Sequence, residues 1–430
     1  MPTWTNWARQ QRCAPERIET PRSEEELVRA IVGARRVKVA GSGHSFTDIA
    51  CTDGVMIDLT AMRRLLAVDG NEVTVEAGIT LHDLGDELRS RDLAMENQGD
   101  VDPQTLAGAI STATHGTGAG YGNLSSQVTG VRLVDGTGEV RDLRDGDELR
   151  AARVSLGALG AISAVRLRCV PAFTIHRLDD PRPLDDLLPR LDQLVDSHDH
   201  WEAFVMPYTR RALTLTSERT DREPRPRGRA GAFVHDVVLE NAVLGLFCRT
   251  GRAFPRTIPS LNRALARLMS GSEHLDASNR VYANTRLVRF TEMEYAIPRE
   301  HAAEALERVL ALIERRRLPI GFPIEFRVTA PDDALLSTAH GRPTAYIAVH
   351  QYVGMEFETY FRAVEAIMDD YGGRPHWGKR HYQTAATLRP RYPDWDRFTE
   401  IRDRLDPERR FENDYLRRVL TGSGAASGPA

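Results

Sequence analysis

The sequence predicts an α+β fold, in which a first part of many short strands and helices precedes a second, α/β part. Short β-rich runs at residues 37–40, 55–59 and 73–77 alternate with signals for helix starts. Near Pro171 the pattern changes, and the later segments are longer, with an amphipathic helix at residues 300–316. These observations favour two domains of different architecture over one regular βαβ series.

Capping residues indicate where helices of the first part begin. Ser23 is followed three residues later by Glu26, which is the spacing of a capping box. Thr80 precedes a segment with leucines on one face and can cap it. The dipeptide at residues 102–103, Asp-Pro, predicts another helix, because proline is favoured at the first helical position. Further strands are expected at residues 131–134 and 161–167.

The second part is expected to combine helices with buried strands. Strands are predicted at residues 320–328 and 346–352, and a second helix is predicted near residues 357–371. The Pro/Arg-rich stretches at residues 179–183 and 223–230 are expected to be loops. The last ten residues, 421–430, are rich in Gly, Ala and Ser and predict a disordered tail.

Composition describes an ordinary globular chain. It has 430 residues and a net charge of −4, which argues against nucleic acid or an anionic membrane as the main partner. Its four cysteines contain no CxxC pair, so neither a disulfide scaffold nor a zinc ribbon is expected. No signal-peptide core and no run of about 18 apolar residues is present. We expect a cytoplasmic protein without an integral membrane segment; peripheral membrane association and oligomeric state stay open.

Two glycine-rich stretches suit a phosphate-bearing ligand. Residues 41–46, Gly-Ser-Gly-His-Ser-Phe, follow a predicted strand, and such loops let backbone N–H groups approach a phosphate. Phe46 breaks the dinucleotide fingerprint, which needs a small residue there. Residues 112–122 surround His115 with small residues and glycines. Each stretch alone is equally compatible with a turn or a flexible loop, but two in one domain favour a dinucleotide.

Charged residues on two later segments are candidates for chemistry. Glu325 and Arg327 are two residues apart on a predicted strand, so their side chains share a face. They form either a surface ion pair of little energetic weight or part of a substrate cleft. Lys379 follows Trp377 in a turn that can present an ammonium to an electron-rich ring, or simply join two helices. No HExxH, GxSxG or regular metal-ligand spacing occurs, so no metal is expected.

Taken together, these stretches resemble the vanillyl-alcohol-oxidase-type FAD-linked oxidases, and among them the aldonolactone oxidase branch. The resemblance covers nearly the whole chain and is weakest across residues 175–280. It is carried by the motifs at residues 5–8, 41–45, 48–54, 113–118, 294–298, 324–327, 373–379 and 404–407.

The resemblance implies a two-subdomain FAD-binding domain of the PCMH type at residues 1–171 and a substrate cap at residues 172–372. Residues 373–420 would return to complete the FAD domain and the active site. The cofactor-binding residues implied are Ala40, Gly41, Ser42, Gly43, His44, Ser45, Phe46, Gly99, Ser111, Thr114, His115, Gly116, Gly118, Ile162, His376 and Lys379.

His44 matches the family position that attaches the flavin through its 8α-methyl carbon. Relatives with a second, cysteinyl link carry a cysteine downstream, and none of the cysteines here matches it, so a single histidyl bond is expected. The resemblance further implies catalytic roles for Glu325, Arg327, His350 and Lys379, and substrate contacts for Asp100, Glu292 and Tyr352. By itself, His350 reads as a partly buried strand histidine.

The implied reaction is FAD-dependent oxidation of a sugar-derived lactone, such as L-gulono-1,4-lactone, at a carbinol carbon. An alditol oxidase is the nearest alternative; Asp100 stands where that enzyme has a substrate-contacting serine. A non-catalytic flavin-binding protein is a third. Gly99 leaves space beside the flavin and favours oxygen as the electron acceptor, although a cytochrome or quinone stays open. Gly99 is equally compatible with a simple turn.

Overall fold

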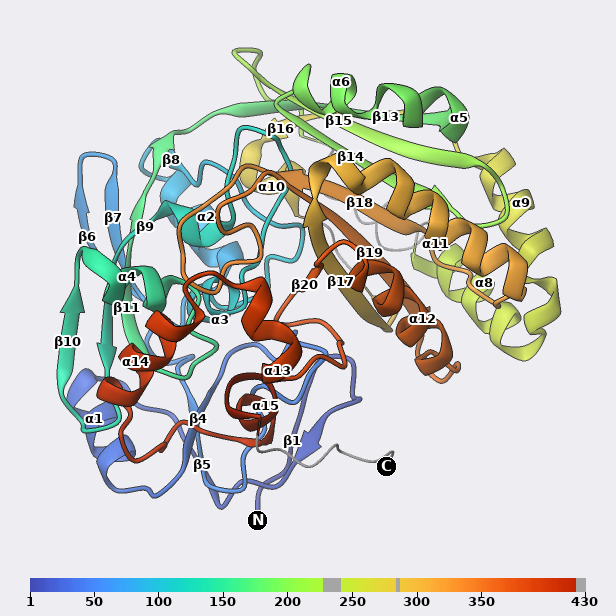
Figure 1. Cartoon of the computed structure of the whole chain (residues 1–430). Coiled ribbons are helices and arrows are strands. Elements are labelled where there is room, and N and C mark those ends of the chain that lie inside the picture. Colours follow the sequence, from blue (N-terminus) through green and yellow to red (C-terminus); the bar gives the residue numbers. More distant parts are fainter. Residues whose placement is uncertain (227–240, 284–286, 423–430) are drawn as a thin grey trace.

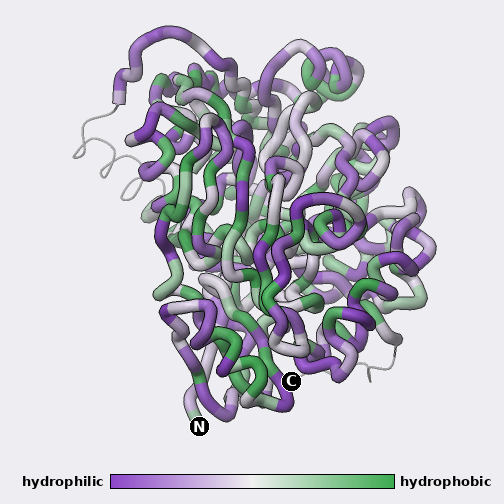
Figure 2. The backbone as a smooth tube through the Cα atoms, turned by 90° about the vertical axis from the view of Figure 1, so that its left-hand side faces the viewer, coloured by the Kyte–Doolittle hydropathy of each residue, from purple (hydrophilic) through white to green (hydrophobic). Residues whose placement is uncertain are grey.

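The computed structural model describes residues 1–226, 241–283 and 287–422. Helices and sheets are mixed throughout, as predicted, and two parts are visible in Figure 1, one on the left and one at the upper right. Hydrophobic stretches run along the strands, whereas most outer loops are hydrophilic (Figure 2). No helix within the described ranges is both long enough and apolar enough to cross a membrane.

A small parallel sheet opens the chain. Its order is β3 (Arg17–Glu19), β5 (Val55–Asp58) and β4 (Val37–Ala40). Helix α1 (Glu24–Val32) connects β3 to β4 and begins where the sequence predicts, because the Ser23 side chain accepts a hydrogen bond from Glu26 N. The glycine-rich loop at residues 41–46 therefore leaves the end of a buried strand.

A five-stranded antiparallel sheet follows. Its order is β10 (Val140–Leu143), β9 (Val128–Val134), β11 (Ala161–Arg168), β7 (Glu72–Glu76) and β6 (Leu65–Asp69). Helices α2 (Leu81–Arg89), α3 (Leu106–Ser111) and α4 (Gly146–Arg153) accompany it. Thr80 caps α2, as predicted. A helix does follow residues 102–103, but the predicted position of its first residue is wrong. Residues 102–103 form a turn, and the helix begins only after its N-cap, Thr105.

The second part is built on an eight-stranded sheet. Its order is β16 (Ser272–Ala277), β13 (Thr174–Pro183), β15 (Arg211–Thr220), β14 (His200–Met206), β18 (Ile324–Thr329), β19 (Thr344–Tyr352), β17 (Phe290–Pro298) and β20 (Arg374–Pro375). Helices α11 (Ala302–Arg316) and α12 (Glu358–Asp369) contact it and each other. Almost every residue of β17, β18 and β19 is buried, so charged side chains on these strands lie inside the molecule.

The loop predicted at residues 179–183 is wrong, since these residues complete strand β13. From Thr174 to Asp179 the strand lies between β15 and β16, but beyond Asp179 only β15 pairs with it. The prolines at this end therefore lie where one side of the strand has no partner, and there a missing N–H is tolerated. In the other predicted loop, residues 223–226 lack regular structure, and residues 227–230 lie outside the described residues.

The C-terminal segment returns to the first part (Figure 1). Helix α14 (Trp395–Leu405) contacts α4, and its apolar residues join the hydrophobic core of the first two sheets. Asn413 donates hydrogen bonds to three carbonyls of residues 48–51, and Lys38 donates to Phe411 O. Strand β20 still belongs to the large sheet, two residues beyond the predicted boundary at 372.

The remaining elements are short or peripheral. They are β1 (Trp4–Thr5), β2 (Arg12–Cys13), β8 (Leu93–Ala94), β12 (Val170–Pro171), α5 (Leu184–Leu187), α6 (Leu191–Asp196), α8 (Asn241–Ala253), α9 (Ile258–Leu268), α10 (Ser278–Tyr282), α13 (Ala385–Leu388) and α15 (Asp414–Leu416). A π-helical turn ends at Thr421, the first residue of the predicted tail, and residues 423–430 lie outside the described residues.

Candidate active site

The glycine-rich loop after β4 lines a cavity of about 110 Å³ between the first two sheets. The predicted cofactor-binding residues that line it are Ala40, Gly41, Ser42, Gly43, His44, Ser45, Ser111 and Ile162. A methyl group at Gly41 would lie 2.4 Å from Thr105 Oγ1, and Gly43 has a φ of +72°. Only glycine fits both places without strain, so the backbone can approach a ligand closely.

A second cavity, of about 350 Å³, adjoins the first and shares His44 and Ser45 with it. Its walls come from both parts of the chain. The predicted residues that line it are His44, Ser45, Phe46, Gly99, Asp100, Thr114, His115, Glu292, Glu325, Arg327, His376 and Lys379. Two joined cavities, one bordered by glycines and one by charged groups, suit a long ligand with a phosphate-bearing half and a reactive half.

Strand β18 carries the Glu325 and Arg327 pair into this second cavity. The two residues are 3% and 6% exposed, so the surface ion pair is excluded. Arg327 Nη2 contacts Glu325 Oε1, and Arg327 Nε donates to Glu202 Oε2 on β14 at 2.6 Å. Asp100 Oδ2 lies 3.4 Å from the same guanidinium. Burial alone would lower the pKa of Arg327. The three carboxylates have the larger, opposite effect, so the pKa of the guanidinium lies above its ordinary value.

Strand β17 contributes two more carboxylates, which the ammonium of Lys379 holds. Lys379 Nζ lies 2.5 Å from Glu292 Oε1 and 3.0 Å from Glu294 Oε2. The two residues are i and i+2 on the strand and share a face. Burial raises the pKa of Glu292, but Lys379 and then His350 lower it to about 2. The pKa of Glu294 is lowered for the same reason, chiefly by Lys379.

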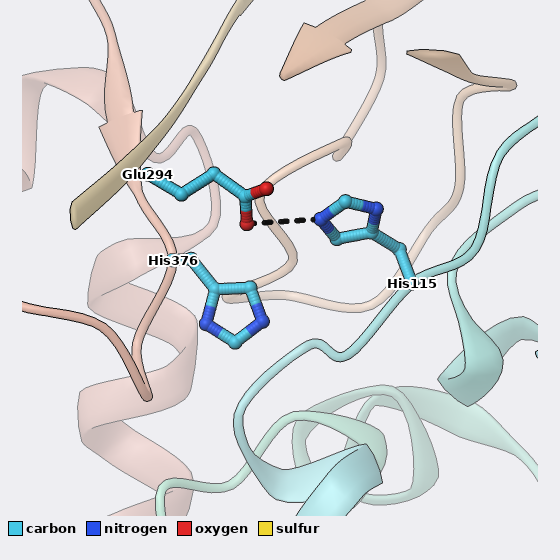
Figure 3. A group of neighbouring side chains, drawn as sticks. All are labelled: His115, Glu294 and His376. Atoms are coloured by element: carbon cyan, nitrogen blue, oxygen red, sulfur yellow. Dashed lines mark hydrogen bonds and ion pairs between the residues drawn. The ribbon is translucent and has the colours of Figure 1, made fainter. Parts of the chain in front are cut away.

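His115, Glu294 and His376 converge from three different segments (Figure 3). His115 Nδ1 lies 2.9 Å from Gly116 O and its Nε2 lies 3.1 Å from Glu294 Oε2. Because a carbonyl and a carboxylate are both acceptors, a proton must lie between His115 and Glu294. Burial lowers the pKa of His376 to about 3, so this ring is neutral at pH 7. The ring of Tyr346 stacks on His115 with a centroid distance of 3.6 Å.

In the described parts of the chain, two groups of three residues bring their possible ligand atoms close enough together to hold a metal ion. In both groups the carboxylates are also in contact with Lys379 or Arg327. These groups are His115, Glu294 and His376, and Glu292, Glu325 and His350. Lys379 already contacts Glu294 and Glu292, and Arg327 contacts Glu325. The positive charge that these carboxylates require is therefore supplied by side chains of the chain itself.

Several predicted residues lie outside the second cavity. His350 is behind it, with Nε2 3.2 Å from Glu292 Oε1 and 3.9 Å from Glu325 Oε2, so it supports both carboxylates. Tyr352 lines a separate small cavity, under the Arg252 side chain. Gly116 lines a third, smaller cavity, and Gly118 N donates to Val328 O.

Sequence reasoning missed Glu202 and assigned no role to Glu294. Glu202 is the single carboxylate of a mostly apolar, mostly buried strand, and Glu294 is one of two carboxylates in β17, whose other residues are largely apolar and buried; such carboxylates are a usable signal for a functional group. The sequence could not show that β14 lies beside β18, which brings Glu202 to Arg327. Trp7 was also missed; its ring stacks on His44 with a centroid distance of 5.7 Å.

Comparison with known proteins defines the class of this fold and site. Residues 15–144 match the model of an FAD binding domain. The whole chain superposes on cholesterol oxidase from Brevibacterium sterolicum (His121Ala mutant) with a TM-score of 0.84 at 17% identity, covering 97% of this chain and 96% of the other. These findings confirm the predicted fold class and the FAD-binding domain. The chain has the fold of the FAD-linked oxidases.

Residues 165–419 match the model of D-arabinono-1,4-lactone oxidase, and the chain belongs to this family of FAD-dependent oxidoreductases. It is 59% identical to the L-gulono-1,4-lactone dehydrogenase of Mycobacterium tuberculosis, over 97% of this chain and 99% of that protein. It is 34% identical to mouse L-gulonolactone oxidase, over 96% and 97%. It is also 30% identical to the alditol oxidase of a Streptomyces species, over 97% and 99%. The predicted family is confirmed.

The Lys379 cluster predicts how stability depends on pH. The folded-state pKa of Glu292, about 2, lies below its ordinary value of 4.5, so its ionisation stabilises the fold above pH 4.5. That stabilisation, on the order of 3 kcal/mol, is lost as the pH falls from 4.5 towards 2. In Lys379→Met, burial without the ammonium raises the folded-state pKa values of the carboxylates towards or above 4.5, so their ionisation no longer stabilises the fold. The variant should be less stable than the wild type near pH 7, and the difference should narrow as the pH falls from 4.5 towards 2. Urea unfolding between pH 3 and pH 8 measures this.

The matched control is Lys379→Arg, which keeps the positive charge and should follow the wild-type pH profile. If Lys379→Met and the wild type lost stability over the same pH range, the ammonium would not be what keeps the two carboxylates ionised.

Proposed function

We propose that this chain oxidises an aldono-1,4-lactone such as L-gulono-1,4-lactone at a carbinol carbon. The observation that carries the proposal is the buried group of Glu325, Arg327 and Lys379, which lines the same cavity as His44. Membership of the D-arabinono-1,4-lactone oxidase family and the name of the relative at 59% identity support the lactone as substrate.

The glycine-bordered loop and the neighbouring cavity fit FAD. In this proposal residues 41–46 hold the pyrophosphate by backbone N–H groups, and Ile162 lies beside the adenosine half. His44 stands in the wall common to both cavities and would bond to the 8α-methyl carbon of the flavin. When bound, the flavin supplies a hydride acceptor, its N5 atom.

The side chains in and around the second cavity would bind the substrate, accept its proton and stabilise negative charge. Glu325 accepts the hydrogen bond of the substrate hydroxyl and takes its proton, and Arg327 donates to a neighbouring substrate oxygen. His350, behind the cavity wall, orients Glu292 and Glu325. Lys379 places a positive charge at the cavity wall, where it stabilises negative charge that develops during reduction.

The charge balance of the cavity favours a neutral substrate. The described residues that line it include four carboxylates, Asp100, Asp102, Glu292 and Glu325, but only two permanent cations, Arg327 and Lys379. An excess of buried carboxylates accepts hydrogen bonds from hydroxyl groups and repels an anion. The intact lactone therefore suits the cavity better than the carboxylate formed when its ring is hydrolysed.

An alditol oxidase is the second candidate, because a neutral polyol satisfies the same charge balance and a relative of that name covers the chain. Electrons then pass to O2 or to another acceptor. The relatives' names include both a dehydrogenase and an oxidase, so they do not decide the acceptor.

Anaerobic titration separates the substrate classes. We expect L-gulono-1,4-lactone or a related aldonolactone to bleach the flavin absorbance near neutral pH, with xylitol and sorbitol at least about 10-fold slower, since one missing set of ring contacts costs 1–3 kcal/mol. The open-chain aldonate is the matched control and should not bleach it. Faster bleaching by an alditol would favour the second candidate, and no bleaching by either class would contradict the proposal. Admitting air after bleaching tests O2 as acceptor.

Acid precipitation tests the histidyl bond. The flavin should stay with the precipitated wild-type protein and appear in the supernatant of His44→Ala, because no other side chain is proposed to attach it. His115→Ala is the control, since His115 lines the same cavity but is given no covalent role, and its flavin should remain in the pellet. Flavin extracted from the wild-type protein would exclude the covalent link.

A further inference from the structure

A third, smaller cavity shares lining residues both with the candidate active site and with a cavity that reaches the surface. It has a volume of about 30 Å³, and Asp100 and Arg327 line both it and the active-site cavity. Gln98 lines both it and a cavity of about 330 Å³ that is bordered by the exposed residues Asp221 and Pro224. The three cavities therefore follow one another through shared walls, from the active site to the surface.

The walls of the small cavity are polar. Asp100 and Arg327, which also line the active-site cavity, border it together with Glu202 and Arg177, and His200 and Tyr282 face it as well. A volume of 30 Å³ holds one or two water molecules, since one water needs about 10–15 Å³ and two or more polar partners. Water can therefore bridge the arginine cluster and the histidine.

His200 lies on the same strand as Glu202, two residues before it, so both side chains point to the same face. It is 2% exposed, and its Nε2 lies 2.9 Å from Tyr282 Oη. Its Nδ1 is buried and makes no hydrogen bond of good geometry among the described residues, although a backbone group of Ser217, the residue paired with it on β15, lies near the ring. A water molecule in the small cavity, which the ring lines, would complete the bonding of this nitrogen.

The ring of His200 is suited to passing a proton on. Burial lowers its pKa to about 4, so at pH 7 the ring is neutral, with one nitrogen as donor and the other as acceptor. Burial also raises the pKa of Tyr282, which keeps the phenol protonated. A neutral imidazole can accept a proton at one nitrogen while it releases one from the other, and a protonated phenol can continue the chain.

The proposed oxidation requires such an outlet. A carbinol that becomes a carbonyl loses a hydride, which the flavin accepts, and one hydroxyl proton, which must reach solvent. Glu325 takes that proton while substrate still fills the active-site cavity. Arg327, which contacts Glu325, also lines the small cavity, as do its two other carboxylate partners, Glu202 and Asp100. Asp100 lines the active-site cavity as well, so its carboxylate can carry the proton from one cavity to the other.

We propose that His200 and Tyr282, together with water in the small cavity, form a proton outlet from the Glu325–Arg327–Glu202 cluster to the large cavity and solvent. The inference rests on the proposed function, because it needs a substrate that releases a proton. His200 and Tyr282 touch neither substrate nor flavin in this scheme and act as positioning residues for the proton.

Anaerobic stopped-flow with a pH-indicator dye tests the outlet. One trace follows flavin bleaching by the lactone, and the other follows the proton that appears in solution. In the wild type the two traces should coincide. In His200→Ala we expect proton release to lag behind bleaching by about 10²-fold, the lower end of what a positioned proton-transfer group contributes. Added imidazole, which fits the space left by the side chain, should restore it.

Tyr282→Phe gives a second, milder variant in case His200→Ala fails to fold, and it should also delay proton release. His176→Ala, a histidine paired with Glu273 outside the three cavities, is the control and should behave as the wild type with or without imidazole. Melting temperatures of all variants exclude misfolding. Coincident traces in a folded His200→Ala or Tyr282→Phe, or a lag in His200→Ala that imidazole does not shorten, would overturn the proposal.

The direction of the route is tested separately. Asn279 lines the large cavity, and a tryptophan there should fill it. In His200→Ala/Asn279→Trp the imidazole rescue should be lost, and rescue that persists would contradict a route through this cavity. Failure of the proposed function looks different, because then neither lactone nor alditol bleaches the wild-type flavin.

Discussion

The ammonium of Lys379 between the buried carboxylates of Glu292 and Glu294 is the interaction on which the rest of the site depends. Without it, the two neighbouring carboxylates would keep only their histidine partners, His350 and His115, inside the protein. A buried charge that is not fully compensated costs several kcal/mol. Main-chain bonds flank it, since His376 N donates to Glu294 O and Arg380 N donates to Glu292 O. Phe46 N donates to Gly378 O in the same turn. One turn thus joins the eight-stranded sheet, the glycine-rich loop and the C-terminal segment.

The distribution of charge inside the molecule differs from that of the whole chain. The chain as a whole is nearly neutral, with 57 basic and 61 acidic residues, and only two of the basic ones are lysines. Both lysines line cavities proposed to hold FAD or substrate: Lys38 the first, Lys379 the second. Arginine therefore supplies nearly all the positive charge of the surface, whereas the ammonium groups of both lysines lie inside the protein. Around Lys379 the carboxylates outnumber the cations, and we therefore propose a neutral, hydroxyl-rich substrate.

Much of the fold could be predicted from local signals. Ser23 and Thr80 marked helix starts because a cap is a contact between near neighbours. The prolines near residues 102 and 181 misled the prediction, because proline fits a turn, a first helical turn or a strand edge equally, and tertiary pairing decides. The pair of Glu325 and Arg327 was predictable from spacing, but the partner Glu202 was not, because strand order is a long-range property. The surroundings of Gly99 could not be predicted from the sequence either. A methyl group at this position would lie 3.0 Å from His115 O, and this close approach depends on the tertiary structure.

We propose that Lys379 does more than neutralise two carboxylates, and that its charge promotes substrate oxidation. The most direct measurement is the rate of anaerobic flavin reduction by an aldonolactone in Lys379→Met, in stopped-flow at a pH where the variant is folded. A loss of about 10²-fold or more, as for removal of a preorganised charge at a reacting centre, is the predicted result, with most of the rate retained in Lys379→Arg. A reduction rate equal to that of the wild type would contradict the account.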